Sequence, residues 1–181
     1  MKSEKKFARD FEPNPNKEPR DYQRKRLYDW EEAQFGDPEK TPHSERMSMS
    51  EIHDLIQELC ETFSVHTPVL TDGRGRRSAC FLEPDERPPY EIHTDWQGNS
   101  VPNTRGIIKM PKFARVRWVV LHELSHCFMY HFYGYRHSAH GSHFTTLYTS
   151  LLGNKAGCDV HQLRMSARRA GLRCVRSRVS Q

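Results

Sequence analysis

Apolar residues recur every three to four positions in five parts of the chain, the spacing that places them on one face of an α-helix. The predicted helices cover residues 21–35, 48–63, 113–133, 144–152 and 159–171. Residues that favour helix ends support these bounds: Ser48 or Ser50 and Asp159 suit an N-cap, and Gly36, Gly134 and Gly171 suit a helix stop. The helix over 113–133 is the most apolar, so we expect it to be buried.

Between the second and third helices, three short β-prone runs alternate with turn residues. They cover residues 78–82, 90–94 and 106–110, and Pro, Gly and Asn residues separate them. We expect three strands of one small sheet, which makes the fold class α+β. The run 106–110 comes directly before the longest helix. It fits either an edge strand that binds an extended peptide or an ordinary core strand, and the sequence leaves both open.

Length and composition indicate one domain with polar extensions. The chain has 181 residues, of which 35% are hydrophobic and 28% are charged. Residues 1–19 are predicted to be a disordered or tethered tail, so the domain covers residues 20–181. No run approaches the ~18 apolar residues of a membrane span, and the N-terminus lacks the apolar segment of a signal peptide. We therefore expect a cytoplasmic protein without a membrane partner.

The cysteines and the charges bear on what else the chain binds. The five cysteines are odd in number and include no Cys-x-x-Cys, so neither a disulfide framework nor a zinc knuckle is indicated. The net charge of +5 is concentrated at the C-terminal end, where residues 155–181 hold seven basic side chains and one acidic side chain. Arginines suit phosphates, so nucleic acid is a second class of partner, but no aromatic platform for bases accompanies them. A solvated basic end is the simpler interpretation.

The longest predicted helix contains the sequence His122-Glu123-Leu124-Ser125-His126. On a helix, His122 and His126 lie one turn apart on one face, close enough for both imidazoles to bind one cation. Glu123 projects about 100° round the axis from His122 and can reach a metal-bound water without being a ligand. Zn²⁺ lowers the pKa of such a water to about 7, and a carboxylate beside it takes the proton. If this motif were a coincidence, the charged Glu123 would be buried in an apolar helix without a partner, which costs free energy.

A catalytic zinc usually has three protein ligands, so the chain must supply a third one. A short-spacer motif is excluded, because Met129 and Phe132 stand where it requires Gly and His. A downstream Glu ligand is also excluded, since Glu123 is the last glutamate of the chain. His131 lies about 140° round the helix from His126, too far to share the metal.

The remaining candidates follow the helix. They are His137, His140, His143, His161 and, as a weak alternative, Asp159. His140 has the best setting, because Gly141 beside it lets the chain fold back and the apolar residues 144–152 anchor it.

These residues together resemble a known pattern. His122-Glu-Leu-Ser-His126 followed by His140-Gly-Ser-His-Phe144 resembles the signature of SprT/Spartan-like zinc metallopeptidases. With the opening Arg-Asp-Tyr-Gln-Arg at 20–24 and the Gly-Leu turn at 171–172, the chain is more closely similar to a small family of zinc metallohydrolases of actinobacteria and their phages, over about residues 20–179.

The resemblance implies a minimal zincin-like metallopeptidase domain, in which a small twisted sheet packs on the His-Glu-x-x-His helix and further helices complete the fold. It implies that His122, His126 and His140 are zinc ligands and that Glu123 is the general base. The signature often has an acidic residue where this chain has His143. His143 is therefore a competing ligand or a group beside the site, ranked below His140.

We expect a zinc-dependent hydrolase, foremost a metallopeptidase acting on a peptide or protein substrate. The alternative is a zinc-stabilised DNA- or protein-binding module without catalysis, whose closed site would take a fourth ligand such as His143 or Asp159. A hydrolase also needs a donor for the oxyanion of the transition state. The candidates are Tyr133, Tyr135, His137 and His143, and the sequence does not choose among them.

Overall fold

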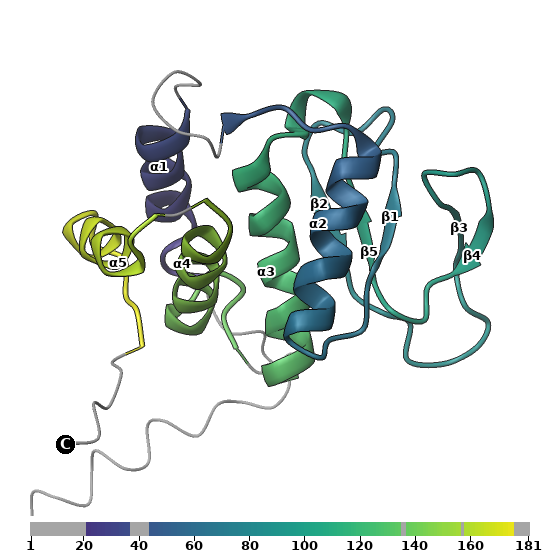
Figure 1. Cartoon of the computed structure of the whole chain (residues 1–181). Helices are drawn as coiled ribbons and strands as arrows, with labels where there is room; N and C mark the ends of the chain where they lie inside the picture. Colours follow the sequence, from purple (N-terminus) through teal and green to yellow (C-terminus); the bar gives the residue numbers. More distant parts are fainter. Residues whose placement is uncertain (1–20, 37–43, 135–136, 157, 176–181) are drawn as a thin grey trace, which may run out of the picture.

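The computed structural model describes residues 21–36, 44–134, 137–156 and 158–175, and it shows a mixed α+β fold (Figure 1). In these residues the helices are α1 (Arg24–Phe35), α2 (Met49–Thr62), α3 (Arg117–Tyr133), α4 (Ser142–Ala156) and α5 (Val160–Arg169). The strands are β1 (Val69–Thr71), β2 (Cys80–Leu82), β3 (Ile92–Thr94), β4 (Ser100–Pro102) and β5 (Ile107–Lys109). The predicted α+β class is therefore confirmed. The tail predicted for residues 1–19 lies outside the described residues.

Helix α2 begins at Ser48, one of the two serines proposed as its N-cap. The Ser48 hydroxyl accepts a hydrogen bond from the Glu51 backbone N–H at 3.2 Å, and the Glu51 carboxylate accepts one from the Ser48 N–H at 2.7 Å. This capping box satisfies two amides that have no partner inside the helix. The local sequence thus sets where α2 starts.

Helix α3 starts later than the apolar pattern predicted. Residues 112–114 form a separate 3₁₀ turn, and Val116 has an extended backbone that forms a β-bridge with Arg46. The bridge keeps residue 116 out of the helix, so α3 begins at Arg117. It ends as predicted at Gly134, whose positive φ of 62° suits a residue without a side chain.

The strands form two sheets rather than the single sheet that we expected. The three-stranded sheet has the order β1-β5-β2, with β1 parallel and β2 antiparallel to β5. Strands β3 and β4 pair only with each other, as an antiparallel hairpin that extends away from the helices in Figure 1. The backbone N–H of Trp96 donates to the Leu70 carbonyl at 3.0 Å and ties the hairpin to β1.

The structure also decides the role of the 106–110 run. Strand β5 lies between β1 and β2, and both Ile107 and Ile108 are fully buried. The core-strand interpretation is confirmed and the edge-strand interpretation is wrong. The edge nearest α3 is instead β2, which packs directly against that helix.

Helix α3 lies at the centre of the molecule. Figure 1 shows α2 and the three-stranded sheet on one side of it and α1, α4 and α5 on the other. The fully buried core draws on most of these elements and includes Leu27, Ile56, Ile108, Leu121, Leu124, Phe128, Phe144 and Tyr148. Because α3 is covered on both sides, polar residues along it are held inside the fold.

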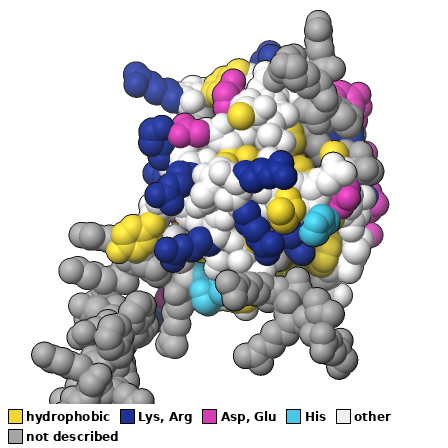
Figure 2. Space-filling view, turned by 90° about the vertical axis from the view of Figure 1, so that its left-hand side faces the viewer, with side chains coloured by type: hydrophobic (Ala, Val, Ile, Leu, Met, Phe, Trp, Pro, Cys, Tyr) yellow, Lys and Arg dark blue, Asp and Glu magenta, His cyan; other side chains and the backbone are white. Residues whose placement is uncertain are grey.

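The outer surface beside α1 and α5 is rich in basic side chains. Figure 2 shows several Lys and Arg side chains on this face, which is the left-hand side of Figure 1. Helix α5 belongs to the basic C-terminal region that left nucleic acid open as a partner. In the part of the chain that is described, no helix is long and apolar enough to cross a membrane.

Candidate metal centre

The structure brings His122, His126 and His140 together. The first two lie one turn apart on α3, and His140 comes from the loop before α4. The Nε2 atom of His122 is 3.2 Å from Nε2 of His126 and 3.3 Å from Nε2 of His140. One ligand atom from each ring lies within 4.8 Å of the others. These three histidines could therefore hold a metal ion.

Two of the three separations between the nitrogens fit a tetrahedral ion. Two Zn–N bonds of about 2.0–2.1 Å at the tetrahedral angle place their nitrogens about 3.3 Å apart. The two Nε2 separations of 3.2 and 3.3 Å match this value. No fourth His, Cys, Asp or Glu among the described residues joins the group.

Carboxylates hold the far nitrogen of two of the rings. Nδ1 of His122 lies 2.6 Å from the Glu31 carboxylate, and Nδ1 of His140 lies 2.5 Å from the Asp21 carboxylate. A proton on Nδ1 donated to each carboxylate leaves Nε2 with a free lone pair, which is the tautomer that binds a metal. In that tautomer the lone pairs of His122 and His140 face each other, and a cation between them relieves the repulsion.

Burial keeps the imidazoles of His122 and His126 neutral. It lowers the pKa of His122 to about 3, with further contributions from His140 and Arg24, and it lowers the pKa of His126 well below its usual value. Neutral imidazole is the form that binds metals, so these two rings need not lose protons near pH 7 before a cation enters.

Aromatic rings close the inner side of the triad. The ring centroid of Phe144 lies 5.0 Å from His122, 4.6 Å from His126 and 5.0 Å from His140. Tyr148 contacts His122 at 5.6 Å, and its hydroxyl lies beside both the Glu31 carboxylate and the Trp118 carbonyl. Both Phe144 and Tyr148 are fully buried, so water cannot approach the rings from this side.

The loop that carries His140 is fastened to α1 by Gln23. The Gln23 side-chain amide donates to the His140 carbonyl at 2.7 Å and to the Thr145 hydroxyl at 3.2 Å. Its oxygen accepts from the backbone N–H of Arg173 at 2.9 Å. One buried amide therefore joins α1, the His140 loop and the segment after α5.

Glu123, the predicted general base, is buried on the sheet side of α3. Burial raises the pKa of its carboxyl to about 7, against the opposing effect of a hydrogen bond from the Phe81 backbone N–H on β2. A carboxyl group with a pKa near 7 can both accept and release a proton at neutral pH.

The competing ligand candidates lie elsewhere. The His143 ring contacts Tyr133 at 4.6 Å and His137 at 4.7 Å, and these three rings form a separate cluster. Asp159 caps α5, since its carboxylate accepts from the backbone N–H of His161 at 2.7 Å. Neither His143 nor Asp159 belongs to the triad, whereas His140 does.

Sequence reasoning missed the groups that surround the triad from α1. Asp21, Gln23 and Glu31 contact the histidines or their loop, and the Tyr28 ring lies against two of them. One signal was present: Glu31 falls at i+4 from the buried Leu27, on the apolar face of the helix, where a carboxylate requires a partner. The partner itself has no signature in the sequence.

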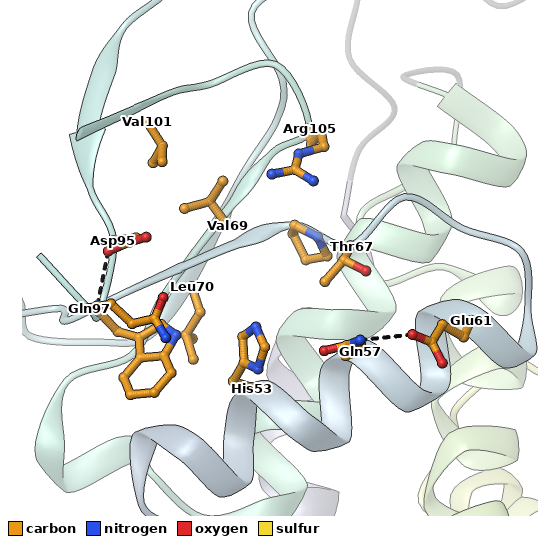
Figure 3. A pocket seen from close by; sticks show the side chains of 12 residues that line it. His53, Gln57, Glu61, Thr67, Val69, Leu70, Asp95, Gln97, Val101 and Arg105 are labelled. Atoms are coloured by element: carbon orange, nitrogen blue, oxygen red, sulfur yellow. Dashed lines mark hydrogen bonds between the residues drawn. The ribbon is translucent and has the colours of Figure 1, made fainter. Parts of the chain in front are cut away.

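A hollow lies away from the triad. It has a volume of about 310 Å³ and is bounded by α2, β1 and the β3–β4 hairpin (Figure 3). His53 and Trp96 form part of its wall, with ring centroids 5.7 Å apart. None of the triad residues lines it, and neither does Glu123.

Comparisons of the chain with family models, with curated proteins and with solved structures gave no match. What this site can do must therefore be judged from its own geometry and chemistry.

Proposed function

We propose that the protein is a zinc-dependent hydrolase, foremost a metallopeptidase. The observation that carries the proposal is the convergence of the Nε2 atoms of His122, His126 and His140, with Nδ1 of two rings against buried carboxylates. Three imidazole ligands with no fourth side chain among the described residues are typical of catalytic zinc rather than structural zinc. Magnesium and calcium are disfavoured, because they prefer oxygen ligands.

When bound, zinc would act as a Lewis acid that polarises the substrate carbonyl and lowers the pKa of water, so that water can lose a proton and attack the carbonyl at neutral pH. The chain supplies the proton transfer. Glu123 is the base that takes a proton from the attacking water and passes it to the leaving amine. Its pKa of about 7 supports this role, because the carboxyl can change protonation state in both steps. The Phe81 N–H holds the carboxylate in place.

The outer edge of β2, which pairs with no other strand in the described part of the chain, supports a peptide as substrate. The Gly106 carbonyl and the Met110 N–H form hydrogen bonds with β1. Because backbone groups alternate in direction along a strand, the N–H and C=O of Ile108 also point toward β1. Phe81 is opposite Ile108, so its N–H and C=O point away from β5. The outward N–H reaches Glu123. An extended peptide that added to this edge would run beside the proposed base.

The sequence resemblance to SprT/Spartan-like zincins agrees with this proposal. The alternative, a zinc-stabilised binding module, would need a fourth ligand. Its two candidates, His143 and Asp159, are occupied in other contacts. The lack of a fourth side-chain ligand among the described residues therefore favours a hydrolase.

Substitution of the base tests the proposal. Glu123→Gln keeps the fold and the zinc, because the amide oxygen can still accept from the Phe81 N–H, but it removes the base. We expect one zinc per chain and at least a hundredfold slower cleavage of unfolded casein. Glu86→Gln, which changes an exposed carboxylate, is the control with unchanged cleavage. Full activity of Glu123→Gln would refute the mechanism.

A further inference from the structure

A hydrolase of the proposed kind needs a hydrogen-bond donor for the oxygen that becomes negative in the transition state. Three of the four candidates from the sequence, Tyr133, His137 and His143, contact one another instead of the triad. The fourth, Tyr135, lies outside the described residues. Tyr148 contacts His122 but is fully buried behind it, so it cannot meet a substrate.

Tyr28 on α1 lies beside the triad. Its ring centroid lies 5.7 Å from that of His122 and 5.5 Å from that of His140. Its side chain is 40% exposed, so it borders the triad and also meets solvent. Glu31 lies one turn further along the same helix and holds His122, which fixes the position of Tyr28 relative to the imidazoles.

Arg24 lies one helical turn before Tyr28 and supports it. The guanidinium carbon is 5.5 Å from the centroid of the Tyr28 ring, and the guanidinium also hydrogen-bonds the Tyr28 side chain. No described carboxylate lies within ion-pair distance of this guanidinium. An Arg that donates to the phenol oxygen leaves the O–H proton free and makes it a stronger donor.

The charge of Arg24 also reaches the triad, since it contributes to the lowered pKa values of His122 and His126. A positive charge beside a proposed cation site repels the cation and weakens its binding. The same charge favours an anion that is bound to the cation. This arrangement suits a site that must stabilise negative charge during the reaction.

We propose that Tyr28 is the hydrogen-bond donor to the anionic oxygen at the triad, and that Arg24 positions and polarises its hydroxyl. The inference rests on the function proposed above and deepens it, because it assigns the group that recognises a tetrahedral, negatively charged centre. Tyr28 is the catalytic residue of the pair, and Arg24 acts through it.

The test uses Co²⁺ as a visible replacement for zinc and inorganic phosphate as a tetrahedral anion. The full-length protein is loaded with Co²⁺, and phosphate binding is followed by the change in cobalt absorption. Tyr28→Phe removes only the hydroxyl, so we expect unchanged cobalt content and about tenfold weaker phosphate binding. Tyr133→Phe is the matched control and should bind phosphate like the wild type.

Arg24→Gln is then compared in the wild-type and Tyr28→Phe backgrounds. The charge of Arg24 attracts phosphate in both backgrounds, so its removal weakens binding in each. If Arg24 also positions Tyr28, the loss is clearly larger in the wild-type background than in the Tyr28→Phe background. Equal losses in both backgrounds would overturn the positioning role. Equal phosphate affinity of Tyr28→Phe and wild type would overturn the donor role while leaving the metal site intact. A chain that takes up no Co²⁺ would overturn the proposed function and this inference with it.

Discussion

The Glu31 carboxylate lies 2.6 Å from Nδ1 of His122, although 91 positions separate the two residues. Likewise, the Asp21 carboxylate lies 2.5 Å from Nδ1 of His140, although 119 positions separate them. Both carboxylates come from α1 or the turn directly before it. Helix α1 is therefore part of the candidate metal centre and not only a cover for the core.

The first prediction concerns these two carboxylates. Glu31→Gln and Asp21→Asn replace the carboxyl groups that hold Nδ1 of His122 and His140, so each should weaken zinc binding about 10- to 100-fold. Competition with a chromogenic chelator measures the affinity. Glu32→Gln, at the exposed neighbouring position of α1, is the control. Wild-type affinity in both variants would show that the carboxylates do not orient the ligands.

The second prediction separates the two histidines that competed as third ligand. His140→Ala removes a nitrogen from the triad, and His143→Ala removes a ring whose described contacts lie in the separate cluster with Tyr133 and His137. After dialysis we expect roughly 0.2 equivalents of zinc or less in His140→Ala, because the site has lost one of its three ligands. His143→Ala should retain about one equivalent. Elemental analysis gives both values, and the reverse outcome would reassign the third ligand.

The third prediction concerns pH and the metal-free protein. Burial raises the pKa of Glu123 from 4.5 to about 7, so the folded state binds a proton more tightly than the unfolded state. This contribution to the free energy of unfolding is fully present below pH 4.5 and is lost as the pH rises to about 7. Glu123→Gln cannot ionise. In the metal-free state, the free energy of unfolding of this variant relative to the wild type should therefore be about 2 kcal/mol higher at pH 8 than at pH 5.

Urea unfolding of the metal-free proteins at the two pH values measures this difference. Glu86→Gln should show no change relative to the wild type, because that carboxylate is exposed in both states. The same pH dependence in wild type and Glu123→Gln would mean that Glu123 is ionised inside the folded protein.

The fourth prediction distinguishes stability from metal binding. Gln23→Ala leaves the His140 carbonyl and the Arg173 N–H without their partner, so we expect a loss of about 2 kcal/mol in the free energy of unfolding. Zinc affinity should fall as well, since the His140 loop loses its tie to α1. Ser48→Ala removes the cap of α2 and should cost about 1 kcal/mol with no change in zinc affinity. Equal zinc affinity in both variants would contradict the role of Gln23.

Local patterns in the sequence predicted the elements well. The helices follow the apolar repeats, Ser48 caps α2, and Gly134 ends α3, because each of these features depends on neighbours within one or two turns. The spacing of His122 and His126 belongs to the same class, since a helix alone brings them to one face. Position 140 could be singled out because Gly141 follows it.

The sequence did not predict how the strands are distributed. The run at 90–94 was expected in the same sheet as its neighbours, but β3 pairs with β4 as a separate hairpin. Strand β1, which was not predicted, takes the place beside β5. Such pairings join residues that are far apart in the chain, and a short β-prone run carries no mark of its partner.

By itself, then, the sequence determined the helices, two histidines on one face and a third within reach of them. Only the tertiary structure decided that Asp21 and Glu31 hold two of these rings, that Tyr28 borders them, and that His143 stays apart. The physical reason is that side chains on one helix are placed by the local helical repeat. Contacts between α1 and α3 instead depend on how the apolar faces of whole elements pack together.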